Sequence, residues 1–420
     1  MDKLFINPSG PLHGTVTVHG AKNAVLPIMA ACLLTEERSI IENVPNVTDV
    51  VTMIEILRSL GVEAEIRGDR LTVTPGRYPG TEASYELVSR MRASICVLGP
   101  LVAKQGRAKV AMPGGCVIGN RPVDLHRKGL QALGVSTSLE GGYIVAEAPA
   151  LKGARIQLGG AFGSSVLATD NVMMAATLTP GTTVIEQAAC EPEVVDLAHF
   201  LIAMGATIEG HGSPVIRVTG VPRLHGASHR VIPDRIEAGT LMIATAIVGG
   251  DLTIEGARAD HLGAVIDKLS EANVVIEKLN GSLRVQAQGR LQAVDVTTLP
   301  FPGFPTDLQA QMMALMAVSR GVSVLTEKVY PERFKHISEL NRMGAAITLE
   351  GASAIVKGVE RLSGAPVTAP DLRASAALVL AGLVAQHQTE LSGLEHLERG
   401  YENLEAQLVQ LGAKIHRVHV

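Results

Sequence analysis

The sequence predicts an α/β protein of two domains, in which buried helices are surrounded by sheets. The chain length, a pattern that recurs six times and a nearly all-apolar helix in each recurrence predict this fold class. With 420 residues the chain is too long for one ordinary hydrophobic core. Its hydrophobic content of 46% supplies enough apolar side chains for two cores, and its charged content of 19% is low for a disordered protein.

The recurring pattern is a helix-like segment that ends in a dipeptide such as Leu-Gly, followed by two alternating strands with a polar turn between them. The position that ends the helix recurs every 68 to 73 residues, at Gly61, Gly134, Gly205, Asn273, Gly344 and Gly412. Glycine or asparagine at this position suits the left-handed residue that follows a helix. In the first copy the two strands are 62–66 and 70–73.

An apolar helix opens each repeat, and a glycine, a strand and a second, amphipathic helix follow it, so the unit is of the βαβαββ type. Helices that are apolar nearly all round are buried at the centre of a domain. The six predicted central helices are 25–34, 95–103, 172–178, 241–248, 312–318 and 376–385. Six units form two domains of three. We expect 22–232 to hold repeats one to three, and 1–21 with 233–420 to hold repeats four to six, the N-terminal strand pairing with that second domain.

Polar side chains share one register at the start of the predicted central helices. They lie 37 to 42 residues before the helix-ending position, at Lys22, Arg92, Ser165, Asp234, Asp307 and Arg373. A cation at an exposed helix N-terminus opposes the helix dipole by about 0.3–1 kcal/mol, whereas an anionic ligand there would reverse the effect. Any single long side chain can simply extend into solvent. Three cations at one register favour a binding site for a heavily charged anion.

The segment 112–122 is the stretch best suited to covalent chemistry. Three glycines within six residues, bracketed by prolines, indicate a mobile loop that can approach a ligand closely. Cys116 lies in the middle of this loop, and neighbouring Arg121 would favour its thiolate. The other three cysteines fall inside apolar helices or beside acidic residues, at Cys32, Cys96 and Cys190. Without other context, a lone loop cysteine is more often structural than catalytic.

Composition argues against several other classes of function. A net charge of −4 and the absence of tryptophan argue against a nucleic-acid partner. The longest run of small apolar residues is too short for a bilayer, which needs about 20 residues, and the first residues do not resemble a signal peptide. We therefore expect a cytoplasmic chain without a membrane partner. The cysteine spacing fits neither a zinc site nor a disulfide framework, and no nucleotide-cofactor motif occurs.

Seven motifs follow one another over nearly the whole chain. They are GAKNA at 20–24, RMRAS at 90–94, PGGC at 113–116, RPVDLH at 121–126, PDRIE at 233–237, FPTDLQAQ at 304–311 and DLRAS at 371–375. Together they resemble the enolpyruvyl transferase family, most closely its UDP-N-acetylglucosamine 1-carboxyvinyltransferases. The resemblance implies a two-domain inside-out α/β barrel. It also implies transfer of the enolpyruvyl group of phosphoenolpyruvate to the 3′-hydroxyl of UDP-N-acetylglucosamine, through a tetrahedral ketal and with release of phosphate, at the first committed step of peptidoglycan synthesis.

The resemblance further implies roles for single residues and no cofactor or metal; the oligomeric state stays open. Cys116 matches the cysteine that protonates the methylene carbon of phosphoenolpyruvate and can form a covalent adduct, and Asp307 matches the general base near the 3′-hydroxyl. Lys22 and Arg399 complete the catalytic set. The residues implied at phosphoenolpyruvate are Lys22, Asn23, Arg121, Arg333, Arg373 and Arg399. Those implied at the nucleotide sugar are Asn23, Arg92, Arg121, Pro122, Val123, Asp124, Leu125, Ser164, Ser165, Val166, Asp307 and Val329.

Three positions depart from the family pattern, Gly163, Leu167 and Glu398, and they affect the expected geometry of nucleotide binding rather than the reaction. Cysteine rather than aspartate at position 116 predicts alkylation by the epoxide fosfomycin. Two alternatives stay open. A 5-enolpyruvylshikimate-3-phosphate synthase should lack the PGGC and RPVDLH motifs. A catalytically silent paralogue that binds nucleotide sugar is disfavoured because the four catalytic positions are all retained.

Overall fold

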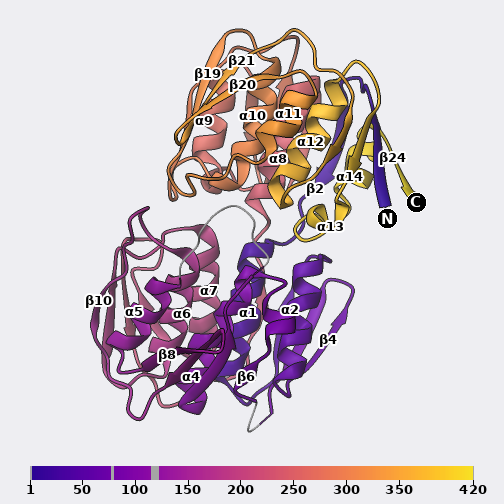
Figure 1. Ribbon diagram of the computed structural model, residues 1–420. Helices are drawn as coiled ribbons and strands as arrows, with labels where there is room; N and C mark the ends of the chain where they lie inside the picture. The colour runs from indigo at the N-terminus through magenta and orange to yellow at the C-terminus, as the bar shows by residue number, and fades with distance from the viewer. Residues whose placement is uncertain (1, 77–79, 115–122, 420) are drawn as a thin grey trace. The chain divides into compact units, whose positions relative to one another are not determined.

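The computed structural model describes residues 2–76, 80–114 and 123–419. They divide into two compact units (Figure 1). The terminal unit consists of the chain up to His19 and from Pro233 onward, and the middle unit lies between Gly20 and Ile232. No helix among the described residues is long and apolar enough to cross a bilayer.

Each unit contains three four-stranded sheets of the same topology, in which one edge strand runs parallel to its neighbour and the other pairings are antiparallel. The sheets of the middle unit comprise β14 (Ser228–Arg230), β3 (Ser39–Glu42), β5 (Arg70–Thr74) and β4 (Glu63–Arg67); β6 (Glu82–Ala83), β7 (Arg107–Ala111), β9 (Tyr143–Glu147) and β8 (Ser136–Glu140); and β10 (Arg155–Gln157), β11 (Thr182–Glu186), β13 (Val215–Thr219) and β12 (Thr207–Glu209).

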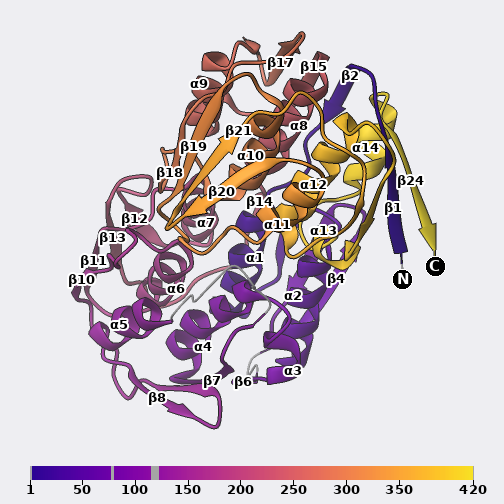
Figure 2. The same ribbon diagram turned by 45° about the horizontal axis from the view of Figure 1, so that its top comes forward.

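The terminal unit repeats this topology. Its sheets comprise β2 (Leu12–Thr17), β15 (Gly250–Glu255), β17 (Ser282–Ala287) and β16 (Val275–Leu279); β18 (Val296–Thr298), β19 (Val322–Glu327), β21 (Ser353–Lys357) and β20 (Ala346–Glu350); and β22 (Pro366–Thr368), β23 (Thr389–Ser392), β1 (Asp2–Asn7) and β24 (Lys414–His419). Both strands of the N-terminal segment therefore belong to this unit: β1 pairs with β23 and β24, and β2 pairs with β15. The two chain ends lie side by side in Figures 1 and 2.

The helices form two classes. The central helices are α1 (Lys22–Ala31), α4 (Leu98–Gln105) preceded by the 3-10 turn η2 (Arg92–Val97), α6 (Val166–Thr177), α8 (Arg235–Val248), α10 (Gln309–Val318) and α12 (Leu372–Val384). The second helices are α2 (Thr48–Ser59), α5 (Asp124–Ala132), α7 (Pro192–Ala203), α9 (Gly263–Glu271), α11 (His336–Arg342) and α14 (Leu404–Gln410). Short segments are η1 (Cys32–Leu34), α3 (Tyr85–Val88), η3 (Ala259–His261), η4 (Thr306–Leu308) and α13 (Leu394–Leu397).

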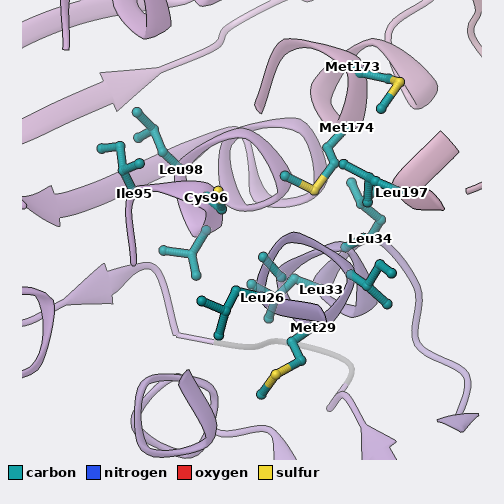
Figure 3. Packing of buried hydrophobic residues seen from close by; sticks show 14 of the residues in the cluster. Leu26, Met29, Leu33, Leu34, Ile95, Cys96, Leu98, Met173, Met174 and Leu197 are labelled. Atoms are coloured by element: carbon teal, nitrogen blue, oxygen red, sulfur yellow. The ribbon is translucent and has the colours of Figure 1, made fainter. Parts of the chain in front are cut away.

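The central helices are buried on nearly every side, as their composition predicts. Figure 3 shows this packing in the middle unit, where Met174 of α6 lies beside Leu197 of α7, and Leu26 and Met29 project from α1. The α/β fold with helices inside and sheets outside is thereby confirmed. Several helices begin earlier than their apolar runs, because their first turns carry polar residues that a cap stabilises, as Asp234 does for α8.

All six helix-ending positions adopt the left-handed conformation, with φ between 74° at Asn273 and 109° at Gly412. In each copy the N–H of this residue donates to the carbonyl three residues before it, and the next N–H donates to the carbonyl five residues before its own position. This pair of hydrogen bonds is a Schellman motif, which satisfies the last carbonyls of the helix. The sequence prediction for these positions is confirmed.

Candidate functional site

The polar register found in the sequence lies at the starts of the central helices, but its members differ in what they do there. Ser165 and Asp234 are N-caps: the Ser165 hydroxyl accepts from Ala168 N, and the Asp234 carboxylate accepts from Ile236 N and Glu237 N. Arg373 is the second residue of α12, and Asp307 lies in η4, directly before α10. The caps stabilise their own helices, whereas the charged residues inside the first turns need another explanation.

Two of these charges, Asp307 and Arg373, meet within the terminal unit, and Arg333 joins them. Arg333 Nη1 lies 2.7 Å from Asp307 Oδ1, and Arg373 Nη2 lies 2.9 Å from Asp307 Oδ2. The Arg373 side chain is 2% exposed and that of Arg333 7%, while Asp307 keeps 24% of its side-chain surface exposed. We call these three residues the Asp307 cluster. It joins η4, α12 and the segment after β19 around a carboxylate that is partly exposed.

The charges of the cluster fix the ionisation of its carboxylate. Burial alone would raise the pKa of Asp307, but the guanidinium groups of Arg373 and Arg333 outweigh burial and hold this pKa well below its usual value. Each carboxylate oxygen bonds to a different arginine, so the plane of the carboxylate is fixed as well as its charge.

Two neighbours besides Asp307 hold Arg373. The Asp371 carboxylate caps α12 and accepts from Arg373 N at 2.9 Å and from Ala374 N at 3.0 Å. The Arg373 guanidinium lies 5.2 Å from the centroid of the Tyr401 ring. A β-carbon at Gly400 would lie 2.8 Å from a methyl carbon of Leu372, so a larger residue there would displace the Leu372 side chain. The segment that begins with half-buried Arg399 thus packs against the first turn of α12.

Two nitrogens of the Arg373 guanidinium, Nε and Nη1, are buried without a hydrogen-bond partner among the described residues. Buried N–H donors that stay unpaired are costly, commonly about 1–3 kcal/mol each. An anion that reached Arg373 would pair these donors, and because both atoms are buried, neighbouring groups would have to move to admit it.

Val329, expected at the nucleotide sugar, follows β19 in the same unit. Its backbone N–H donates to the Oε1 atom of Glu327 at 2.8 Å. Glu327 is fully buried and also accepts from the hydroxyl of Thr306, the residue before Asp307. Sequence reasoning did not single out Glu327, since a glutamate at the end of a strand carries no distinguishing pattern.

Lys22 forms the corresponding buried ion pair of the middle unit. It is the first residue of α1 and only 9% exposed, and its Nζ lies 2.6 Å from Asp49 Oδ2 in the first turn of α2. Asn23, the next residue, is half-buried. A β-carbon at Gly20 would lie 1.7 Å from the carbonyl oxygen of Asn43, which explains the glycine two residues before Lys22.

The residues expected at the nucleotide sugar lie on neighbouring elements of the middle unit. Leu125 is in the first turn of α5, and a β-carbon at Gly160 would lie 3.1 Å from its Cδ1 atom. Gly160 pairs with Gly163 in the loop that leads to Ser165 and α6. The structure therefore brings the 123–125 segment to the 160–166 loop, as the hypothesis of a shared ligand requires.

A buried polar group supports this arrangement. The Asn171 amide donates to the carbonyl of Ile95 at 2.9 Å, lies 2.9 Å from His126 Nδ1 and accepts from Gly99 N at 2.7 Å. It thereby connects α6, α5 and the η2–α4 segment, at whose start half-buried Arg92 lies. Asn171 therefore links these three elements by hydrogen bonds in addition to their apolar packing.

Cys116, Arg121 and Pro122 lie outside the described residues. The other three cysteines give no competing nucleophile. Burial raises the pKa of Cys32 to about 12 and that of Cys96 well above its usual value. Burial and the neighbouring Glu191 raise the pKa of Cys190. Among the described cysteines, none is in a setting that favours a thiolate.

One argument from the sequence needs correction. The cations at the helix starts are not left uncompensated, because the protein supplies Lys22 with Asp49 and Arg373 with Asp307. These carboxylates come from other helices, so spacing along one helix could not reveal the pairs. The N-cap Asp371 could have been found in the sequence, because an aspartate directly before an apolar helical run is a recognisable N-cap signal. The described residues contain no group of three or more histidine, cysteine or acidic side chains suited to a metal ion.

Comparisons with known proteins extend over the whole chain. A family model described as EPSP synthase (3-phosphoshikimate 1-carboxyvinyltransferase) matches residues 6–408. The chain is 52% identical to UDP-N-acetylglucosamine 1-carboxyvinyltransferase 1 of Caldanaerobacter subterraneus subsp. tengcongensis, over 99% of both chains. It is 50% identical to UDP-N-acetylglucosamine 1-carboxyvinyltransferase of Methylacidiphilum infernorum, over 100% of this chain and 99% of that one. Its structure is similar to that of the enolpyruvyl transferase NikO from Streptomyces tendae, with a TM-score of 0.90, 26% identity and coverage of 100% and 99%.

The Asp307 cluster predicts how stability depends on pH. Asp307→Asn should lower the free energy of unfolding at neutral pH by about 1–3 kcal/mol, because two buried guanidinium groups lose a charged acceptor. The pKa of Asp307 is depressed in the folded state, so its contribution is complete above the pKa of the unfolded carboxyl, about 3.9, and is lost as the pH falls through the folded pKa. Urea unfolding should show a constant difference in the free energy of unfolding between wild type and Asp307→Asn from about pH 8 to about pH 5, and this difference should narrow below about pH 4.

The matched control is Asp267→Asn, an exposed position on α9 in the same unit, which should leave stability unchanged. Equal stability of wild type and Asp307→Asn at neutral pH would contradict the account of the cluster. So would a difference that persists undiminished in acid.

Proposed function

This chain belongs to the enolpyruvyl transferase family, which includes EPSP synthase and UDP-N-acetylglucosamine 1-carboxyvinyltransferase. On that premise we propose that its acceptor substrate is UDP-N-acetylglucosamine. It transfers the enolpyruvyl group of phosphoenolpyruvate to the 3′-hydroxyl of UDP-N-acetylglucosamine and releases phosphate. This reaction is the first committed step of peptidoglycan synthesis, in the cytoplasm. Relatives that are about half identical over the full length carry the name of this acceptor, which favours it over shikimate 3-phosphate.

The observation that best supports an anionic substrate is the state of Arg373. This arginine is buried beside a carboxylate, and two of its nitrogens have no acceptor among the described residues. Phosphoenolpyruvate offers a carboxylate and a phosphate, both of which pair well with guanidinium donors. We assign Arg373 and Arg333 to the carboxylate, and Lys22, Arg121 and Arg399 to the phosphate, with Asn23 beside them.

In the proposed reaction, the 3′-oxygen of the sugar bonds to the central carbon of phosphoenolpyruvate while its proton passes to Asp307. Cys116 supplies a proton to the methylene carbon, which becomes a methyl group in a tetrahedral ketal. The bond from the ketal carbon to the phosphate oxygen then breaks, and the leaving phosphate takes up the proton held by Asp307. One methyl proton returns to the Cys116 thiolate as the double bond forms again. The products are the enolpyruvyl ether and inorganic phosphate, and no cofactor or metal takes part.

The low pKa of Asp307 limits when it can act as a base. A carboxylate of low pKa is a weak base toward an ordinary hydroxyl. The hydroxyl proton becomes acidic, however, as its oxygen bonds to carbon, so transfer to Asp307 fits a step in which bond formation leads. Lys22 and Arg399 stabilise charge on the phosphate in this step, and a fixed cation is effective because it needs no reorganisation.

The nucleotide sugar is assigned to Asn23, Arg92 and Asp307, to the 121–125 and 164–166 segments, and to Val329. Within the middle unit, the contact between Leu125 and the Gly160 loop supports assigning the two segments to one ligand. Oligomeric state plays no part in this proposal.

A phosphate-release assay tests the function directly. Purified protein with phosphoenolpyruvate and UDP-N-acetylglucosamine should release inorganic phosphate and form the enolpyruvyl ether, identified by its mass. Shikimate 3-phosphate in place of the nucleotide sugar should give only background. Release with shikimate 3-phosphate alone would favour the EPSP synthase alternative, and no release with either acceptor would favour the silent paralogue.

The role of Cys116 predicts selective alkylation by fosfomycin. Intact-mass analysis should show one adduct, which maps to Cys116 and is absent from Cys116→Asp. The control Cys190→Ser should still form the adduct, because the pKa of Cys190 is raised and disfavours its thiolate. An adduct that survives in Cys116→Asp, or no adduct on the wild type, would refute this role.

A further inference from the structure

Glu327, the last residue of β19, accepts four hydrogen bonds in the interior of the terminal unit. Its side chain is fully buried. Oε1 accepts from the Thr298 hydroxyl at 2.6 Å and from the backbone N–H groups of Val329 at 2.8 Å and Tyr330 at 2.9 Å. Oε2 accepts from the Thr306 hydroxyl at 2.8 Å. A buried carboxylate so fully supplied with donors is a rigid point in the structure.

The direction of each bond follows from the second partner of each hydroxyl. Thr298 Oγ1 accepts from Lys328 N at 3.1 Å, and Thr306 Oγ1 accepts from Arg333 Nη1 at 3.0 Å. Each hydroxyl therefore directs its own proton to Glu327. All four bonds require an acceptor at residue 327, which a carboxylate provides at both oxygens and an amide provides at only one.

The Thr306 hydroxyl connects this buried carboxylate to the Asp307 cluster. Arg333 Nη1 carries two protons and donates one to Thr306 Oγ1 and one to Asp307 Oδ1, the latter at 2.7 Å. The position of Arg333 Nη1 is therefore set jointly by Asp307 and, through Thr306, by Glu327. The same carboxylate also fixes the backbone at Val329, which we assign to the nucleotide sugar.

We propose that Glu327 is a positioning residue for enolpyruvyl transfer, which orients Asp307 through Thr306 and Arg333 and at the same time fixes the Val329 segment. This inference rests on the proposed function. Glu327 is buried and does not touch a reacting atom under this proposal. Its effect is to hold the base and one wall of the sugar site in a single geometry, and misplacing a reacting group by about 1 Å can lower the rate on the order of a hundredfold.

The relay offers a conservative pair of variants at Thr306. Thr306→Val removes the hydroxyl with little change of shape, and Thr306→Ser keeps it. We expect Thr306→Val and Glu327→Gln each to lower kcat/KM for UDP-N-acetylglucosamine by about tenfold or more, and Thr306→Ser to stay near wild type. Because both residues act on Arg333, the double variant should lose much less than the product of the two single effects. The control Glu350→Gln, at the exposed end of β20, should have no effect.

The pH profile separates positioning from a purely structural role. Burial raises the pKa of Asp307, and Arg373 and Arg333 lower it, so a displaced Arg333 should let this pKa rise. In Thr306→Val the acid limb of kcat/KM should move to higher pH, and carbon NMR of the Asp307 carboxyl should show the same rise without any turnover. A structural role would lower the melting temperature but leave the pH profile unchanged.

Two results would overturn the inference. One is wild-type kcat/KM and an unchanged pH profile in folded Thr306→Val. The other is a double variant whose loss of kcat/KM equals the product of the losses in Glu327→Gln and Thr306→Val. If the wild type itself released no phosphate, the proposed function would fail instead, and the NMR titration would still report on the coupling between Thr306 and Asp307.

Discussion

The candidate site depends on one buried ion pair, that between Arg373 and Asp307. An arginine in the first turn of a buried helix faces the unfavourable end of the helix dipole and loses its hydration. The Asp307 carboxylate compensates for both, and it also binds Arg333. This arrangement lowers the pKa of Asp307. It also holds the Arg373 guanidinium rigidly, and two of its nitrogens have no hydrogen-bond partner among the described residues.

The repeated fold explains how such residues come together. Each central helix is buried along nearly its whole length, so its first turn is held by contacts on many sides. Polar residues tolerated in those first turns are therefore caps, such as Asp234, or paired charges, such as Lys22 with Asp49. Residues at one register of the repeats therefore lie at the starts of the central helices, where the candidate site residues are found.

Much of the fold could be predicted from the sequence, because glycine or asparagine marks the end of each second helix and apolar composition marks each central helix. The polar register pointed to Lys22, Asp307 and Arg373, and the family resemblance added Arg333. The supporting carboxylates Asp49 and Glu327 could not be predicted in this way. Their partners lie on other elements, and only the folded backbone brings them within hydrogen-bonding distance.

Kinetics of an Arg373→Lys variant test the central claim most directly. Lysine keeps the positive charge but lacks the planar fork that can bond to Asp307 and to a substrate anion together. With saturating UDP-N-acetylglucosamine, kcat/KM for phosphoenolpyruvate should fall on the order of a hundredfold, whereas Arg361→Lys, at an exposed position in the same unit, should match the wild type. An Arg373→Lys value within about twofold of the wild type would contradict the account.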